Sequence, residues 1–372
     1  MKIFHILVLF LSLISAAHAN YNHIKLAIFD DPRPDPSCNE NSQQFVNSYL
    51  SGINTAITVA SEMGFSITER EFFHQNNLTS IIQQATNAKL WNPDIIIGLS
   101  TSNDFLMSKA FFGDQVILSI SATDSAIVNL PTGFYSLGIP DTQAVKTIIK
   151  FISNHYPNSN LFITSAAESK ESVDFGDLLA QSFKKQFKTK SVIERKFLSD
   201  DMNNLDISKF MAGYQKNDVI VIMSIGYDSA IELMNKISAN LRPIKPIFIT
   251  STDNWGNNLS PKNMNGNYDV YRIDTLSGGE DTKDYKLFLD NYKKIYHAMP
   301  KDKISFVTYQ AVMSFVDALK KYPHEGISSS TKQNLLNSYL LALKYNPNWY
   351  RPPYYMVYKI ENKNEIFYEK IH

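Results

Sequence analysis

The sequence has a single cysteine, Cys38, among its 372 residues. One thiol cannot form an intrachain disulfide, and it argues against a structural zinc site, because such sites rely on several cysteine and histidine ligands. No charge of one sign dominates either, since 36 Lys plus Arg stand against 36 Asp plus Glu. Without a basic excess to meet phosphate groups, nucleic acid is not an expected partner.

Enzyme signatures are also missing. The chain contains no GxGxxG, GxxxxGK[ST], HExxH or GxSxG pattern, and the string nearest to the last, at 98–102, lacks the second glycine. The eight histidines show no metal-ligand spacing. We therefore expect no catalytic residue, no metal and no cofactor, and a protein that is not an enzyme.

Long apolar runs are confined to the N-terminus. Lys2 precedes an apolar run at 3–14, and Ala17-His18-Ala19 offers small residues where a signal peptidase reads. A membrane anchor is the alternative, but about twelve apolar residues are too few to span a bilayer, which needs about twenty. We expect 1–19 to be a signal peptide, cleaved before Asn20, and the mature chain to be periplasmic and soluble.

The mature chain alternates short β-branched runs with segments of helical period. A run that is apolar on both faces, such as 94–98, is typical of a buried parallel strand. The predicted strands are 24–29, 65–72, 94–98 and 116–120, then 160–165, 191–197, 219–224 and 246–250. The predicted helices between and after them include 45–63, 78–88, 103–112, 175–187, 227–237, 283–297, 304–321 and 331–345. Two βαβ series of similar length predict two doubly wound α/β lobes.

The C-terminal tail is rich in Tyr, Ile and Val, and Glu361-Asn362-Lys363-Asn364 supplies turn residues between two short strands. Two short strands joined by a turn do not continue either βαβ series. We interpret this ending as a return of the chain to a lobe that it has already built.

Polar runs follow two strands of the first series. Ser100-Thr101-Ser102-Asn103-Asp104 comes after 94–98, and Ser121-Ala122-Thr123-Asp124 after 116–120. Open α/β sheets bind ligands at the carboxyl ends of their strands, and hydroxyls with free N–H groups suit a small carboxylate. Ordinary helix capping is the alternative, because the same residue types are favoured N-caps.

The chain resembles the type I periplasmic solute-binding proteins, and within them the branched-chain amino-acid (Leu/Ile/Val) binding family of ABC transporters. The resemblance covers nearly the whole mature chain. It rests on 24–29, 45–56, 95–98 with 100–102, 117–125, 175–180, 219–227, 247–253 and 305–319.

This resemblance implies two Rossmann-like lobes joined by three crossover strands. Lobe 1 would comprise 20–138 plus 277–346, and lobe 2 would comprise 139–276 plus 347–372. The crossovers would lie near 136–141, 273–278 and 345–351.

The resemblance also implies an amino-acid ligand. Its carboxylate would meet Ser102, Ser121 and Thr123, with Ser100 beside them. Its ammonium would meet Asp253. Its flanks would meet three aromatic residues, Phe45, Phe175 and Tyr227.

The sequence departs from the family at several of these places. Phe45 and Phe175 stand where the family usually has tyrosine, and Asp253 stands where it usually has glutamate. The Pro- and Asp-rich segment 30–37 replaces a Gly-rich loop. Phe175 also fits a core position, and Asp253 could cap the segment that starts at Asn254.

Two functions follow. The first is a monomeric substrate-binding component that delivers an amino acid or similar small polar solute to separate ABC permease and ATPase subunits. The alternative is an envelope interaction or regulatory protein that keeps the same fold with a degenerate cleft.

Overall fold

The computed structural model describes residues 22–30, 40–74, 77–99, 101–113, 115–124, 126–127, 133–223, 227–251, 264–274, 282–301, 303–321, 329–344, 355–361 and 364–371. The chain divides into two compact units. Unit 1 comprises Met1–Gly138 and Gly279–Tyr350, and unit 2 comprises Ile139–Gly278 and Arg351–His372. None of the helices in these described ranges is both long enough and apolar enough to cross a membrane.

Unit 1 is built on a parallel sheet with the strand order β2-β1-β3-β4-β5. The central strand β3 is buried at all four positions, as expected of a strand covered on both faces. The strands are β1 (His23–Phe29), β2 (Ser66–Glu71), β3 (Ile95–Gly98), β4 (Ile117–Ser119) and β5 (Phe134–Ser136). Strand β5 was not predicted from the sequence, and it is only three residues long.

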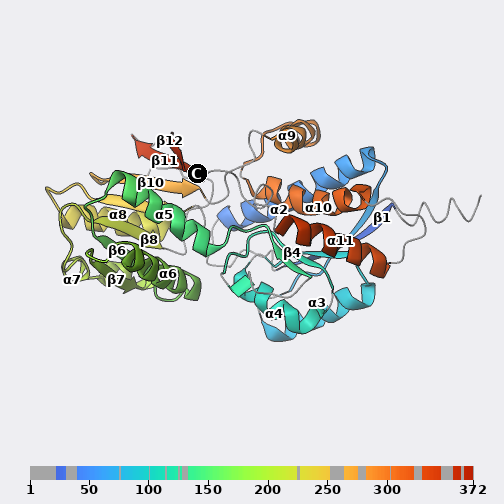
Figure 1. Cartoon of the computed structure of the whole chain (residues 1–372), viewed down its shortest axis with the longest axis horizontal. Helices are drawn as coiled ribbons and strands as arrows, with labels where there is room; N and C mark the ends of the chain where they lie inside the picture. Colours follow the sequence, from blue (N-terminus) through green and yellow to red (C-terminus); the bar gives the residue numbers. More distant parts are fainter. Residues whose placement is uncertain are drawn as a thin grey trace, which may run out of the picture. The chain divides into compact units, whose positions relative to one another are not determined.

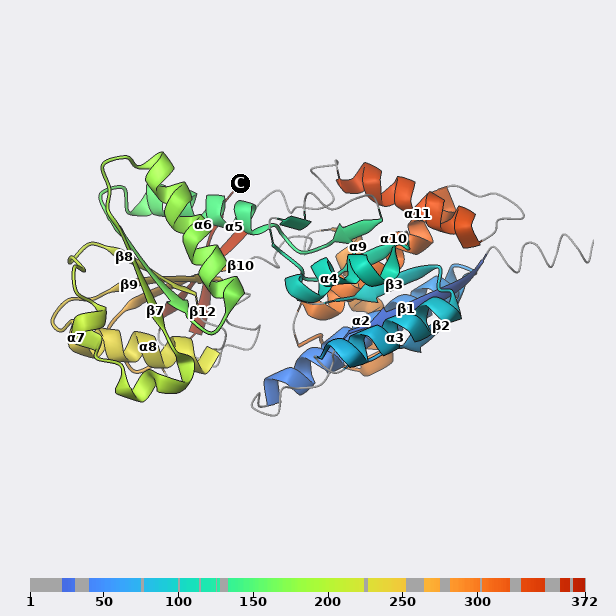
Figure 2. The same cartoon turned by 90° about the horizontal axis from the view of Figure 1, so that it is seen from below.

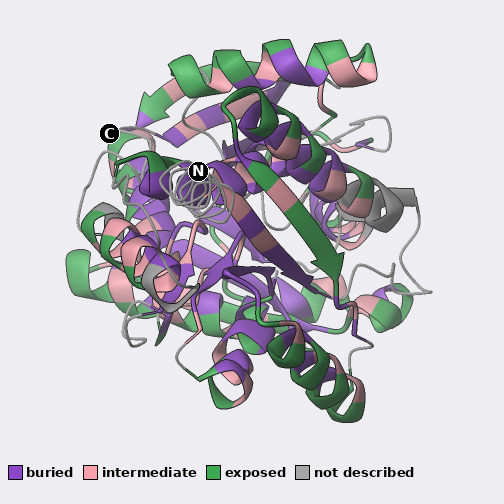
Figure 3. Cartoon of the chain, turned by 90° about the vertical axis from the view of Figure 1, so that its right-hand side faces the viewer, coloured by how far each residue is buried: buried purple, intermediate pink, exposed green. Residues whose placement is uncertain are grey.

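Helices cover both faces of this sheet (Figure 1). One face carries α3 (Leu78–Trp91) and α4 (Ser102–Phe112), whose apolar residues join one core cluster with β1 and β3. The other face carries α2 (Glu40–Glu62), α10 (Ile304–Lys321) and α11 (Ser329–Lys344), and α9 (Lys283–Tyr296) packs on the outer side of α2 and α10. Figure 3 shows buried residues on the inward sides of the helices and exposed residues on their outward sides.

Unit 2 contains a mixed sheet with the order β12-β11-β10-β9-β8-β6-β7. Neighbouring strands from β7 to β10 pair in parallel. The pairs β10–β11 and β11–β12 are antiparallel. The strands are β6 (Leu161–Ala166), β7 (Val192–Phe197), β8 (Val219–Met223), β9 (Ile247–Ser251), β10 (Asp269–Asp274), β11 (Tyr355–Glu361) and β12 (Asn364–Ile371). The C-terminal strands thus complete a sheet that begins some 200 residues earlier, as β11 pairs with β10.

Two core clusters lie on the two faces of the unit 2 sheet. One face is covered by α5 (Asp141–His155) and α6 (Lys170–Gln186), and the other by η2 (Ser199–Asn204), α7 (Ile207–Phe210) and α8 (Tyr227–Asn240) (Figure 2). The start of α6 was predicted too late, at Phe175. Ser169 caps the helix, since its side chain accepts a hydrogen bond from the Ser172 N–H, and the polar first turn that follows carries no apolar stripe.

Candidate functional site

The two polar runs of unit 1 lie at one edge of its sheet. Strands β3 and β4 are parallel neighbours, with Gly98 opposite Ser119. Their carboxyl ends therefore point to the same side, where open α/β sheets bind ligands. The run at 121–124 starts two residues after β4, and Ser102 opens α4 four residues after β3.

Ser102 connects these two strand ends. Its side chain is buried, and its Oγ accepts hydrogen bonds from the backbone N–H groups of Thr123 and Asp124, both at 3.1 Å. The capping role belongs to the preceding residue, because Thr101 Oγ1 accepts from the Asp104 N–H at 3.1 Å. The structure thus brings Ser102 and Thr123 together, and Ser102 fixes the loop after β4. Their contact with a ligand stays a prediction.

Two further serines hold the same loop, and neither was predicted from the sequence. The fully buried Ser119 donates through Oγ to the Leu99 carbonyl at 2.8 Å and accepts from the Ala122 N–H at 3.0 Å. Ser136 donates through Oγ to the Ala122 carbonyl at 2.6 Å. A serine inside an otherwise apolar buried strand was the available signal for Ser119. Together these contacts present Ser121 and Thr123, both half-buried, in one fixed arrangement.

A second polar pair lies at the carboxyl end of β1. Asp30 and Tyr49 are both buried, at 6% and 3% exposed, and Tyr49 comes from α2. Burial, with the Asp30 carboxylate as a smaller contribution, raises the pKa of Tyr49 well above its usual value. Gly98, with φ of +122°, allows Phe29 and Tyr49 to approach its backbone closely. A Cβ at this position would lie 2.2 Å from the Phe29 carbonyl oxygen and 3.2 Å from the Tyr49 hydroxyl.

The predicted Phe45 belongs to α2, one helical turn before Tyr49, and its side chain lies outside the described residues. Tyr49 was overlooked although its four-residue spacing puts it on the same side of the helix. Ser100 and Asp253 also lie outside the described residues. Tyr227 is the first residue of α8, and its side chain is likewise outside them.

The structure places Phe175 in the hydrophobic core of unit 2. It is 6% exposed and belongs to the same core cluster as Leu179 and Met223. Nearby, Ser172 Oγ accepts from the Ala166 N–H at 2.9 Å and donates to the Met223 carbonyl, so it joins the ends of β6 and β8. Core packing accounts for Phe175, and its contact with a ligand stays a prediction.

No group of three or more His, Cys, Asp or Glu side chains within the described ranges is arranged to hold a metal ion. No protein-family model matches the sequence, and no curated protein matches it. Solved structures do match it, over almost the whole chain.

Three solved structures illustrate the likeness. A leucine-binding protein from Thermotoga maritima matches with a TM-score of 0.72 and 14% identity, over 94% of this chain and 99% of that one. A branched-chain amino-acid transporter substrate-binding protein from Streptococcus pneumoniae, in complex with isoleucine, matches with a TM-score of 0.66 and 16% identity, over 94% and 99%. An ABC transporter substrate-binding protein from Desulfitobacterium hafniense, in complex with leucine, matches with a TM-score of 0.67 and 11% identity, over 93% and 100%.

The chain has the type I periplasmic binding-protein fold. The prediction of that fold, which the resemblance to the type I periplasmic solute-binding proteins implied, is confirmed. In a type I fold each lobe is a doubly wound sheet, which is what units 1 and 2 are. The structural neighbours are substrate-binding proteins and not enzymes.

Proposed function

We propose that the protein is the substrate-binding component of an ABC transporter. The observation that carries the proposal is the loop at 121–124, fixed to α4 through Ser102 at the carboxyl edge of the unit 1 sheet. Neutral hydroxyl donors held in one arrangement suit a small carboxylate, because little reorganisation is needed when it binds.

The proposed ligand is an amino acid or a similar small polar solute held between the two units. Ser102, Ser121 and Thr123 serve its carboxylate, with Ser100 beside them, and Asp253 serves its ammonium. Phe45, Phe175 and Tyr227 flank it. The protein acts as an exported, periplasmic monomer without a cofactor and delivers the solute to separate permease and ATPase subunits.

The test starts with a thermal-shift screen over the amino acids, followed by calorimetric titration of the best one. Asp253→Ala should weaken binding by roughly two to four powers of ten, because losing one partner of a buried charge pair costs about 3 to 5 kcal/mol. Phe45→Ala should cost less, since it removes apolar area without leaving a charge unpaired.

Asp174→Ala is the matched control. This exposed aspartate also belongs to unit 2 and pairs with Lys170 in the same helix, so its removal should leave the affinity unchanged. Equal affinities of the wild type and Asp253→Ala would remove Asp253 from the site, and the amino-acid assignment with it.

Two observations favour the alternative, an envelope interaction or regulatory protein with a degenerate cleft. Phe175 is packed in the core, and the Ser102 hydroxyl oxygen already accepts two backbone N–H groups. A screen in which no solute raises the melting temperature of the folded protein would support this alternative.

A further inference from the structure

Unit 1 buries an imidazole that has no hydrogen-bond partner. His74 follows β2 and is 1% exposed, and neither Nδ1 nor Nε2 is paired within the described part of the chain. The residue is well fixed. Its backbone N–H donates to the Asp30 carbonyl at 3.1 Å, and its ring packs on the Phe29 ring with the centroids 4.9 Å apart. A buried polar group without a partner costs free energy, so a group that binds to it recovers that cost.

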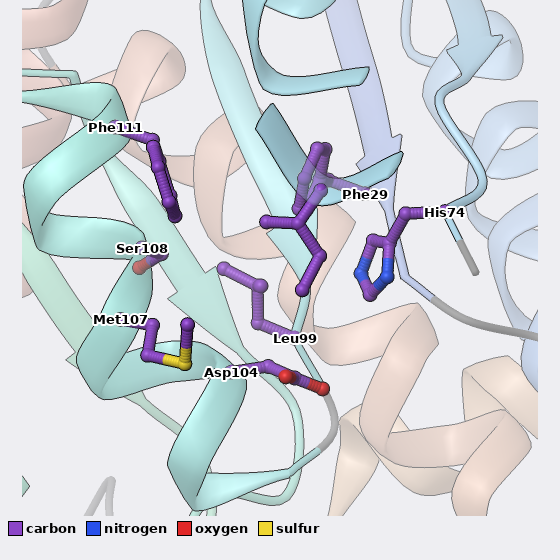
Figure 4. Close-up of a pocket in the computed structure, with 8 residues that line it drawn as sticks. Phe29, His74, Leu99, Asp104, Met107, Ser108 and Phe111 are labelled. Carbon is purple, nitrogen blue, oxygen red and sulfur yellow. The ribbon is translucent and has the colours of Figure 1, made fainter. Parts of the chain in front are cut away.

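The imidazole points into a small cavity between β1, α3 and α4 (Figure 4). Asp104 and Ser108 of α4 share its lining with His74. Phe29, Met107 and Phe111 contribute apolar walls. All of these residues belong to unit 1.

The polar lining offers a neutral acceptor at His74 and a charged one at Asp104. A neutral imidazole has one nitrogen that accepts and one N–H that donates, whereas the Asp104 carboxylate accepts and carries a negative charge. Ser108 donates its hydroxyl hydrogen to the Phe105 carbonyl at 2.6 Å, so it has no hydrogen to offer to the cavity. An acid in the first turn of a helix is ordinary by itself, but Asp104 is only 8% exposed and stands beside apolar walls.

We propose that this cavity is a binding site for a primary ammonium group. Its positive charge complements the Asp104 carboxylate, and its N–H groups can donate to that carboxylate and to the accepting nitrogen of His74. The alkyl stem would lie along the apolar walls. The aromatic rings of those walls would also attract the charged ammonium end. The site lies within unit 1 alone and does not depend on the proposed amino-acid site.

Binding requires one wall to move, because the walls leave no room for a water molecule as they stand. Met107 is the side chain suited to move, since it is partly exposed, unbranched and has three rotatable bonds. Met107→Ala should therefore strengthen binding, whereas a loss of apolar contact alone would weaken it.

The experiment follows the imidazole ¹⁵N resonances of the whole ¹⁵N-labelled protein, with the His74 signals assigned from their loss in His74→Gln. Methylammonium chloride is added up to about 100 mM, the range suited to a millimolar site. Tetramethylammonium chloride is the parallel titration, because it carries the same charge and no N–H donor. Ammonium chloride forms a third arm that separates a free ammonium ion from an alkylated one.

Methylammonium should shift the His74 resonances in a saturable way, and tetramethylammonium should not. Asp104→Asn should weaken binding about ten- to hundredfold, as expected for the loss of a charged acceptor. Asp290→Asn, at an exposed acid on α9 in the same unit, should leave it unchanged. Equal shifts with both alkylammonium salts, or no shift in the wild type, would overturn the proposal even if Asp104→Asn failed to fold.

Discussion

At the scale of single residues, one buried ion pair fastens the C-terminal part of unit 1 to its first strands. Lys332 of α11 and Asp94, just before β3, are 4% and 2% exposed, with Nζ and Oδ2 3.6 Å apart. Asp94 Oδ2 also accepts from the Lys25 N–H at 2.9 Å, and Lys332 donates to the His23 carbonyl. Burial lowers the pKa of Lys332, and the Asp94 carboxylate opposes that shift.

Lys332→Met should lower the free energy of unfolding by about 3 to 5 kcal/mol, because it leaves a buried carboxylate without its cation. Urea titration followed by circular dichroism measures the change. Lys286→Met, at an exposed lysine of α9 in the same unit, should change the free energy by less than about 0.5 kcal/mol. A Lys332 variant as stable as this control would show that the pair contributes nothing.

At the scale of secondary-structure elements, α2 and α10 pack in close contact through Gly52. A Cβ at this position would lie 2.0 Å from Thr308 Oγ1 and 2.1 Å from the Ser305 carbonyl oxygen. Thr308 Oγ1 lies 3.1 Å from the Tyr49 carbonyl oxygen and 3.0 Å from that of Ile304 in its own helix, so the same contact brings α10 against one of the buried residues at the edge of the sheet.

Gly52→Ala should therefore destabilise the protein by about 1 to 3 kcal/mol through overpacking, although alanine is the better helix former. The melting temperature reports the loss. Thr58→Ala, on the exposed side of α2, provides the comparison and should melt close to the wild type. An unchanged melting temperature for Gly52→Ala would mean that the two helices separate at little cost.

At the scale of the whole molecule, the chain passes between the two units at three points, after Gly138, Gly278 and Tyr350. We expect these crossings to act as a hinge that closes the units around the proposed ligand, a motion known for periplasmic binding proteins. Small-angle X-ray scattering with the best amino acid from the screen should give a smaller radius of gyration than the free protein. An unchanged radius in the presence of a ligand that binds would favour a rigid scaffold.

The sequence by itself determined the type and order of the main elements. The apolar run of β3 and the long stripe of α10 were predicted within one residue, because burial on both faces or along one stripe leaves a periodic pattern. The same reasoning gave the carboxyl edge where Ser102 and Thr123 meet, since parallel neighbours end on one side.

Only the tertiary structure decided which residues meet across long sequence distances. The pairing of β11 with β10, the loop contacts of Ser119 and the burial of Tyr49 and His74 all depend on neighbours that are far away in the chain. Periodicity reports how a residue faces its own element, and it contains no information about which distant group lies opposite. For that reason the alternation of strands and helices could be predicted from apolar runs and helical stripes, whereas the cavity beside His74 could not.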